Sequence, residues 1–441
     1  MPPLASFTPL LLAGFAAARA CTNVTIPVDI SSRQGLFEEF PIEGNIDVAA
    51  FAQAFTQQGR NYTAMLLRDY QTLKGSYEIS AKFCQPDSGS ASTIQLLSHG
   101  IGFDKTYWDL PYNNYNYSYV DIAVKQGYST LAIDRLGIGN SSHGDPLNTI
   151  QAQAEVEALN AITTLLRQGK VPGIDTSFNK VIHVGHSFGS VQSYWLSCLY
   201  PNNTDGLVLT GYSANGSYLP VTVAAWNLHS ARLNQPLRFG NSSSEGVQKA
   251  FGSYGTGTAL LSGIQSLLKN VTIQLSTNEI WNEVATTEVG DLINGYNQTI
   301  APLDYPSGYI VQSDFTATQY VFLLPGRYDI GLGILGEMTK QPVATGEILT
   351  IGSSPMMSPF SGPVLVFTGE NDQPFCGGDC LATGTSAPSI PAEGKKQFPS
   401  ASVFEALIQP ETAHGLNFHY NATAGYEAVQ TWLAAQGLAA S

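Results

Sequence analysis

The clearest candidate for chemistry is the pentapeptide at residues 185–189, which carries Ser187 at its centre. It follows the apolar run 181–184 and opens a stretch with helical spacing. Strand, sharp turn and helix in this order lift a serine hydroxyl into a cleft. Gly185 and Gly189 flank the serine and allow the strand and helix backbones to approach closely. Five residues alone arise easily by chance in a glycine-rich chain, so the nucleophile hypothesis depends on the rest of the sequence.

A serine nucleophile needs a base that takes its proton and a third group that orients the base. Asp372 follows the apolar run 364–367, where a strand end would present it to the active edge of a sheet. Glu370 is the competing acid. His414 lies in the loop after the last predicted strand and is the preferred base, with His419 as the alternative. The order serine, aspartate, histidine is the one that this serine motif requires.

The negative charge that develops on a carbonyl oxygen during acyl transfer needs backbone N–H donors. The amide of Phe188, directly after the serine, is the first predicted donor. In the loop 98–102 the pair His-Gly makes the amide of Ile101 the second, with Gly102 as the alternative. The turn 134–142 is interpreted as a rigid support beside these loops. Four other histidines have no comparable placement and are interpreted as structural: His143, His183, His186 and His229.

The elements that must position these loops follow from the hydrophobic pattern. Strands alternating with helical segments, nearly continuous in apolar character, indicate a mostly parallel sheet covered by helices on both faces. The predicted strands are 93–97, 128–133, 181–184, 207–209, 364–367 and 403–408, and the predicted helices among them are 147–169, 191–200 and 424–435.

The alternation stops between residues 215 and 361, where the sequence predicts helices and loops. Such an insertion between two parallel strands is predicted to form a helical cap, or lid, over the carboxyl edge of the sheet. Its predicted helices are 221–233, 260–268, 279–296, 314–324 and 328–338. Apolar cap residues either line a substrate cavity or form the core of the cap: Trp226, Tyr320, Phe322, Leu323, Met356, Met357 and Phe360. The predicted division is a signal peptide at 1–20, core at 21–214, cap at 215–361 and core again at 362–441.

Composition and the amino terminus indicate an extracellular protein. The chain has 441 residues, only 12% of them charged, and a net charge of −14, which excludes nucleic acid as a partner because phosphate binding needs a basic face. The apolar stretch 4–18, followed by a small-x-small pattern ending at Ala20, predicts a cleaved secretory signal that is too short for a stable membrane span. Sequons for N-glycosylation agree with secretion: Asn23, Asn61, Asn116, Asn140, Asn202, Asn215, Asn241, Asn270, Asn297 and Asn421.

The five cysteines predict two disulfides and one leftover thiol in an oxidising compartment. Cys376 and Cys380 are predicted to close a local loop, and Cys21 is predicted to pair with Cys84. Cys198 falls inside a predicted helix and is interpreted as a buried free thiol. No set of cysteines and histidines has the spacing of zinc ligands, and no metal or cofactor is expected.

Taken together, these motifs resemble the α/β-hydrolase superfamily. The resemblance rests on the pentapeptide 185–189, the loop 98–100, the turn 134–142 and the segments 369–372 and 412–415. The single His-Gly pair of the oxyanion loop is similar to the lipase- and esterase-like branch with a helical cap, and the signal and sequons resemble those of secreted fungal hydrolases. The resemblance covers residues 90–215 and 360–440 and implies an α/β-hydrolase fold.

The resemblance, with a serine where other members of the superfamily carry an aspartate nucleophile, implies hydrolysis of a carboxylic ester through an acyl-enzyme. The expected substrate is a small molecule: an apolar ester, a lactone or a natural-product acyl group. Peptide or amide hydrolysis and carbon–carbon bond hydrolysis use the same triad and are the rival activities. A non-catalytic binding protein on this fold is the alternative of another class. Such a protein usually lacks a triad residue, whereas Ser187, Asp372 and His414 are all present in this sequence.

Overall fold

The computed structural model describes residues 19–89, 91–240 and 303–440, and its centre is an eight-stranded sheet. The strand order is β1-β2-β4-β3-β5-β6-β10-β11. The six strands from β4 to β11 pair in parallel, whereas β1 and β2 pair antiparallel with each other and β2 pairs antiparallel with β4. The predicted mostly parallel α/β sheet is therefore confirmed. The strands are β1 (Arg19–Phe37), β2 (Leu67–Pro86), β3 (Thr93–Ser98), β4 (Ser129–Ile133), β5 (Lys180–His186), β6 (Gly206–Thr210), β10 (Val364–Asn371) and β11 (Phe404–Ala413).

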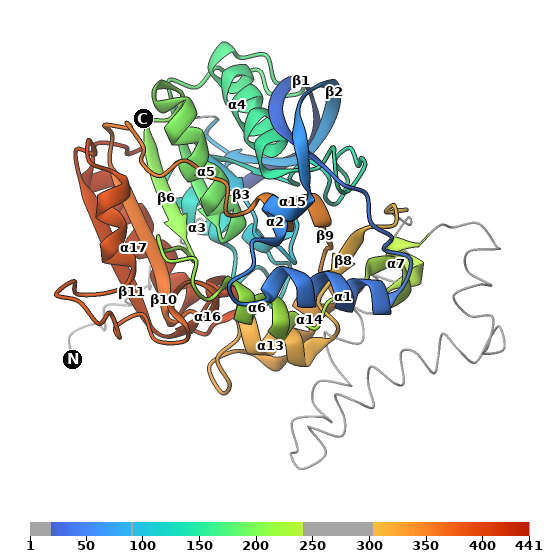
Figure 1. Cartoon of the computed structure of the whole chain (residues 1–441). Helices are drawn as coiled ribbons and strands as arrows, with labels where there is room; N and C mark the ends of the chain where they lie inside the picture. Colours follow the sequence, from blue (N-terminus) through green and yellow to red (C-terminus); the bar gives the residue numbers. More distant parts are fainter. Residues whose placement is uncertain (1–18, 90, 241–302, 441) are drawn as a thin grey trace, which may run out of the picture.

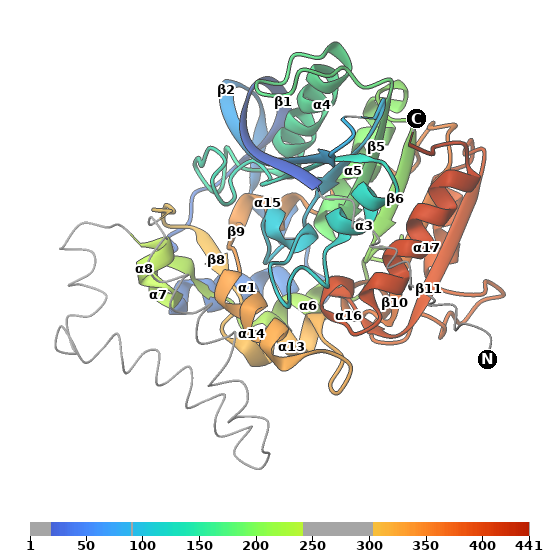
Figure 2. The same ribbon diagram turned by 180° about the vertical axis from the view of Figure 1, so that it is seen from behind.

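Helices cover both faces of this sheet, which explains why its central strands are buried. Every residue of β3, β4 and β6 is buried. Helices α4 (Ala152–Gln168) and α5 (Phe188–Leu199) lie in front of the sheet in Figure 1, whereas α3 (Tyr119–Lys125) and α17 (Ala422–Ala435) lie in front of it in the reverse view of Figure 2. Helix α4 begins later than its apolar spacing predicts, because the Asp145 carboxylate accepts the N–H groups of Leu147 and Asn148 and holds them in a turn.

The amino-terminal part, in which the sequence shows no motif, extends the sheet with the long antiparallel pair β1 and β2. Cys21 and Cys84 stand opposite each other in that pair and form a disulfide. Cys376 and Cys380 form the second disulfide, so both predicted pairings are confirmed. Cys198 is the free cysteine, half-buried rather than fully buried, and its burial raises the pKa of the thiol to about 11. Between β1 and β2 lie α1 (Asn45–Thr56) and α2 (Tyr62–Leu66).

The described part of the predicted cap combines helices with a small antiparallel sheet. Three short strands of order β7-β8-β9 correct the prediction of helices and loops alone. Asn227 ends the first cap helix in the left-handed conformation at φ 43°, which breaks the predicted helix 221–233. The elements are α6 (Leu219–Trp226), β7 (His229–Ser230), α7 (Ala231–Asn234), α8 (Pro236–Phe239), β8 (Tyr309–Val311), α13 (Phe315–Phe322), α14 (Ile330–Thr339), β9 (Val343–Ala344) and α15 (Thr345–Thr350).

The loop that follows β10 contacts the predicted cap. The short helix α16 (Gln373–Cys376) continues from the carboxyl end of that strand and packs against α6 and α13 of the cap. Helices α13 and α14 fill the predicted segments 314–324 and 328–338, whereas the predicted helices 260–268 and 279–296 lie outside the described residues. The domain boundaries at 215 and 361 stay predictions.

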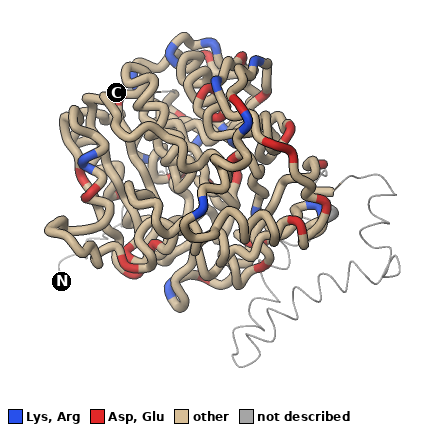
Figure 3. Tube along the Cα trace, in the orientation of Figure 1, with Lys and Arg blue, Asp and Glu red and all other residues tan. Residues whose placement is uncertain are grey.

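Charge and hydropathy of the described chain agree with its composition. Figure 3 shows acidic and basic residues scattered along the trace and separated by long uncharged stretches, as expected for a chain with 12% charged residues. Among the helices of the described ranges, none combines the length and the apolar character that crossing a membrane requires.

Candidate active site

Ser187 lies in a strained turn between β5 and α5. Its backbone angles, φ 55° and ψ −117°, fall in a region that residues other than glycine rarely adopt. A Cβ atom on Gly185 would lie 2.4 Å from the Gly189 carbonyl oxygen, and one on Gly189 would lie 2.3 Å from the Ser98 carbonyl oxygen. The turn therefore requires both flanking glycines, and it leaves Ser187 half-buried between fully buried neighbours.

Asp372 and His414 meet because they follow neighbouring parallel strands, β10 and β11. His414 Nδ1 lies 2.7 Å from Asp372 Oδ2, and both side chains are buried. The same carboxylate also accepts the Thr368 hydroxyl at 2.6 Å and the Phe375 N–H at 2.9 Å. Three donors thus hold Asp372 in place, and it orients the ring of His414. Glu370 is half-buried, and its backbone carbonyl accepts the Cys380 N–H at 2.8 Å.

His419, the alternative base, is occupied by backbone groups. Its Nε2 accepts the N–H groups of Leu324 and Ala413, each at 3.1 Å, and its Nδ1 lies 2.9 Å from the Gly415 carbonyl oxygen. Burial lowers the pKa of His419 to about 4, because desolvation disfavours the charged ring. This histidine braces the loop that carries His414.

The serine turn and His414 lie in one neighbourhood of the fold. The ring of His186, directly before the serine, has its centroid 4.9 Å from that of His414. A Cβ atom on Gly211 would lie 2.7 Å from His186 Cε1 and 3.0 Å from His414 Cε1. Within the described ranges no hydrogen bond joins the Ser187 hydroxyl to His414. Catalytic hydrogen bonds are often long before substrate binds.

The loop after β3 lies directly against the serine. A Cβ atom on Gly100 would stand 2.7 Å from Ser187 Cβ. The amides of Phe188, Ile101 and Gly102 donate to no acceptor among the described residues. Unpaired amides at the start of α5 and in this adjacent loop are available to a developing oxyanion. The choice between Ile101 and Gly102 stays open.

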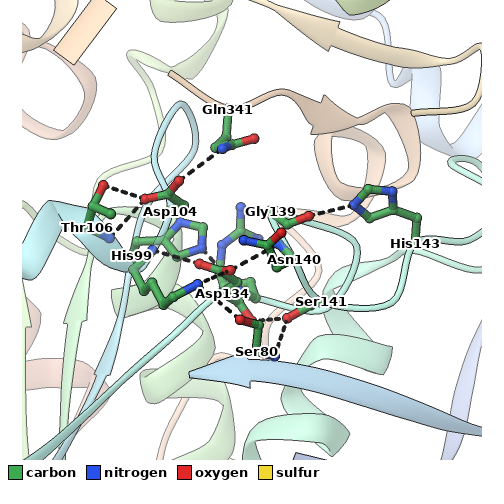
Figure 4. A network of polar contacts seen from close by, with 12 residues as sticks. Ser80, His99, Asp104, Thr106, Asp134, Gly139, Asn140, Ser141, His143 and Gln341 are labelled. Atoms are coloured by element: carbon green, nitrogen blue, oxygen red, sulfur yellow. Dashed lines mark hydrogen bonds and ion pairs between the residues drawn. The ribbon is translucent and has the colours of Figure 1, made fainter. Parts of the chain in front are cut away.

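The turn after β4 supports that loop, in the structural role expected of residues 134–142. His99 Nε2 accepts the Arg135 N–H at 3.1 Å, and Asp134 accepts the Lys105 ammonium at 2.6 Å and the Asn140 N–H at 3.0 Å. Burial raises the pKa of Asp134 above its usual value. Figure 4 shows this network, in which the side chain of Gln341 reaches Asp104 at its upper edge.

A buried arginine connects this support to the serine turn. The Arg135 guanidinium lies 4.8 Å from the ring centre of Phe188. It pairs with Glu155 of α4 at 2.5 Å and with Glu347 of α15. The Arg135 side chain therefore contacts α5, which begins at the serine, the preceding helix α4 and α15 at the end of the predicted cap.

The four histidines that the sequence marked as structural make structural contacts. His183 lies between the hydroxyls of Thr163 and Thr204, and burial lowers its pKa to about 3. His186 stacks on Tyr107 at 4.4 Å, and its pKa lies well below the usual value because of burial and the nearby His414. His143 stacks on Tyr305, and His229 lies in β7.

Aromatic side chains cover the histidine from the cap. Phe322 stacks on His414 with ring centroids 5.6 Å apart, and it also contacts Phe103 and Trp226. Phe322, Trp226, Leu323 and Phe360 are buried. Tyr320, Met356 and Met357 are exposed by 58%, 86% and 63%, so these three are not lining residues: they face solvent from α13 and from the loop after α15.

The parallel sheet, the serine turn after β5 and the cap between β6 and β10 together match the architecture that the sequence resemblance implied. This chain has the α/β-hydrolase fold. Every predicted site residue lies at the carboxyl side of this sheet, where such folds present their active sites. Of the cap side chains near the site, the sequence singled out Phe322 and Trp226 by their apolar character, but it missed Gln312, which no motif marks.

No protein-family model matches this sequence, and no curated protein matches it. Solved structures similar to it include a thermophilic esterase from Thermogutta terrifontis, at 14% identity over 82% of this chain and 94% of that chain, with a TM-score of 0.39. Another is the epoxide hydrolase VrEH1 from Vigna radiata, at 12% identity over 81% of this chain and 95% of that chain, with a TM-score of 0.42. A third is an α/β-hydrolase fold protein from Chitinophaga pinensis, at 13% identity over 81% of this chain and 94% of that chain, with a TM-score of 0.41. Function is therefore argued from the site.

Proposed function

We propose that this protein is a secreted serine hydrolase that cleaves carboxylic esters through an acyl-enzyme. The observation that carries the proposal is the 2.7 Å contact between His414 and Asp372 beside the strained turn of Ser187. A buried carboxylate on Nδ1 fixes the tautomer that leaves Nε2 as the proton acceptor. The proposed chemistry uses no metal and no cofactor.

In the proposed mechanism, Ser187 Oγ attacks the ester carbonyl carbon while His414 Nε2 takes the hydroxyl proton. The carbonyl π electrons move to oxygen, and the oxyanion accepts the N–H groups of Phe188 and Ile101. Collapse of this intermediate expels the alkoxide, which receives the proton from His414. Water then attacks the acyl-enzyme with His414 again acting as base, which releases the acid and restores the serine.

The chemistry around the site favours an apolar ester, lactone or acyl group. Phe322 contacts Phe103, Trp226 and the ring of His414, and all three aromatic residues are buried. Such a wall suits the apolar part of a small substrate.

Secretion and N-glycosylation are part of the proposal and are supported by the two disulfides. The proposed cleavage after Ala20 would remove Arg19 and Ala20 from the start of β1. The buried Asp109 would then lose its contact with Arg19 and keep Lys82 at 2.7 Å. Cys21 would become the first residue and remain tied to Cys84.

The proposal is tested by labelling with a fluorophosphonate and by the hydrolysis of p-nitrophenyl butyrate. The wild type should be labelled, and Ser187→Ala should lose labelling and lower kcat by about 10⁴-fold or more. Ser193→Ala is the matched control, because this buried serine of α5 only donates to the Gly189 carbonyl, at 2.9 Å. Retained hydrolysis in Ser187→Ala would refute the assignment. Aminoacyl anilides and a diketone in the same panel separate ester hydrolysis from the rival activities.

A further inference from the structure

Two cap glutamines reach the oxyanion loop near Gly102, and their amides are used differently. Gln341 is fully engaged in structure. Its backbone N–H donates to the Gly102 carbonyl at 3.1 Å, its Nε2 donates to Asp104 at 2.9 Å, and its Oε1 accepts the Tyr305 hydroxyl at 3.1 Å. Both the donor and the acceptor atom of this side chain therefore bind protein groups that hold the loop.

Gln312, directly after β8, has an amide that makes no such contacts. The residue is 2% exposed, yet its side chain forms no hydrogen bond with any residue in the described ranges. Neither Oε1 nor Nε2 of this side chain is fully enclosed, so both atoms still reach accessible space. An amide that reaches accessible space without a protein partner can exchange its contact with water for a hydrogen bond to a ligand. The unpaired amide is therefore a candidate ligand group.

The backbone of Gln312 is held firmly behind that amide. Its carbonyl accepts the buried Lys340 ammonium at 2.9 Å. Lys340 pairs in turn with Glu337, which accepts the Thr318 hydroxyl of α13 at 2.8 Å. An anchored backbone limits the conformational entropy that the side chain loses when it binds a ligand.

The unpaired amide faces the loop next to the reacting atoms. Gln312 Nε2 lies 3.1 Å from the position that a Cβ atom on Gly102 would take, and the ring of Phe322 lies 3.6 Å from the same position. Phe322 stacks on His414, and Gly100 of this loop abuts Ser187. The amide thus lies next to Gly102 of the proposed oxyanion loop, on the side of this glycine where Phe322 also lies.

We infer that Gln312 determines substrate specificity by hydrogen bonding to a hydroxyl group on the acyl chain of the ester. A carboxamide both donates and accepts hydrogen bonds, so it can pair with a hydroxyl group that acts as the donor or as the acceptor. The inference rests on the proposed function and refines its substrate class, from plain apolar esters to esters of hydroxyacyl groups that are otherwise apolar. A site that offers a buried polar group discriminates against substrates that leave this group unpaired.

The test compares kcat/KM for the p-nitrophenyl esters of butyrate, 2-hydroxybutyrate and 3-hydroxybutyrate. In the wild type, at least one hydroxylated ester should be preferred over butyrate. In Gln312→Leu, which keeps the side-chain bulk and removes the amide, this preference should fall about 10- to 100-fold. Gln341→Leu is the matched control: loosening the loop should slow all three esters alike and leave their ratios unchanged. Gln312→Asn, which retracts the amide, should reduce the preference as well and replaces the leucine variant if that one does not fold.

Two results would overturn the inference. One is a preference that is the same in Gln312→Leu and in the wild type. The other is a wild type that prefers neither hydroxylated ester over butyrate. An equal loss on all three esters in Gln312→Leu gives the first result and would make Gln312 a general support of the loop. Fluorophosphonate labelling distinguishes a failure of the proposed function from a failure of this inference alone. An unlabelled wild type would refute the proposed function together with this inference, whereas a labelled wild type with unchanged ratios would refute the inference alone.

Discussion

At the scale of single residues, hydrogen bonds separate candidates that the sequence leaves equivalent. Glu370 lies near the end of β10 and Asp372 directly after it, yet it is Asp372 that contacts His414 Nδ1. The Thr368 hydroxyl donates to the same Asp372 oxygen, Oδ2, and the Phe375 N–H donates to the other oxygen, Oδ1. Carboxylates held in this way stay aligned with the imidazole, which is what the proposed orienting role needs.

We predict that Asp372→Asn lowers kcat for p-nitrophenyl butyrate by about 10³- to 10⁴-fold with little change in KM, because an amide favours the wrong tautomer of His414. In Glu370→Gln, two residues away, kcat should stay within about threefold of the wild-type value, since this half-buried side chain makes no hydrogen bond with any described residue. Steady-state kinetics of both variants, with melting curves as a control of folding, checks this. A larger loss in Glu370→Gln than in Asp372→Asn would move the acid to Glu370.

At the scale of elements, the two disulfides hold different parts of the fold. Cys21–Cys84 joins residues 63 apart and ties the first strand to the second. Cys376–Cys380 joins residues only 4 apart, in the loop after β10. The N–H groups of Cys376 and Gly378 donate to the Asp372 carbonyl at 3.1 and 3.0 Å, so this short bridge stiffens the backbone of the proposed acid.

We predict that the two bridges differ in their effects on stability and activity. Replacing both cysteines of the long bridge by serine should lower the free energy of unfolding by about 4 kcal/mol, and the same change at the short bridge by about 2 kcal/mol, because loop-closure entropy grows with loop length. The short bridge should nevertheless have the larger effect on kcat. Urea denaturation and kinetics of the two double variants measure both quantities. The prediction fails if removal of the long bridge lowers kcat more.

At the scale of the whole molecule, buried polar groups connect the core to the cap. Arg135 pairs with Glu155 from the core and Glu347 from the end of the cap. Burial raises the pKa of Glu155 well above its usual value, and the guanidinium only partly offsets this. Elsewhere, His183 and His419 are buried in neutral form. These groups make the stability of the entire fold depend on pH.

We predict that the free energy of unfolding falls as the pH is lowered from about 6.5 toward 4. The pKa of His419 is about 4 in the folded protein against 6.5 ordinarily, so in this interval the unfolded chain binds more protons than the folded one. That difference corresponds to about 3 kcal/mol, which is present above pH 6.5 and lost as the pH approaches 4.

Urea denaturation at pH 7 and pH 4.5 tests this. In His419→Gln, the loss of stability between the two pH values should be smaller than in the wild type by about 2 kcal/mol. His229→Gln, at a half-exposed site, should change the pH dependence less. An unaltered pH dependence in His419→Gln would contradict the assignment of a neutral buried histidine.

The elements that could be predicted from the sequence are those that depend on residues close together in the chain. The strands β3, β5 and β10 and the helix α17 were predictable because apolar periodicity is a local property. Three features were not. The pairing of β1 with β2, the small sheet β7-β8-β9 and the start of α4 at Ala152 depend on partners distant in the chain or on a side chain that competes for backbone N–H groups.

The amino-acid sequence by itself determined the α/β class, the glycine-flanked turn of Ser187 and a short set of candidate acids and bases. All of these depend on neighbouring residues, whose spacing dictates backbone geometry. Only the tertiary structure decided which carboxylate faces His414, which histidine is occupied by backbone groups, and that the Gln312 amide reaches the proposed oxyanion loop. Asp372 and His414 meet through the pairing of β10 with β11, and Gln312 reaches its loop through the packing of distant segments, neither of which follows from neighbouring residues.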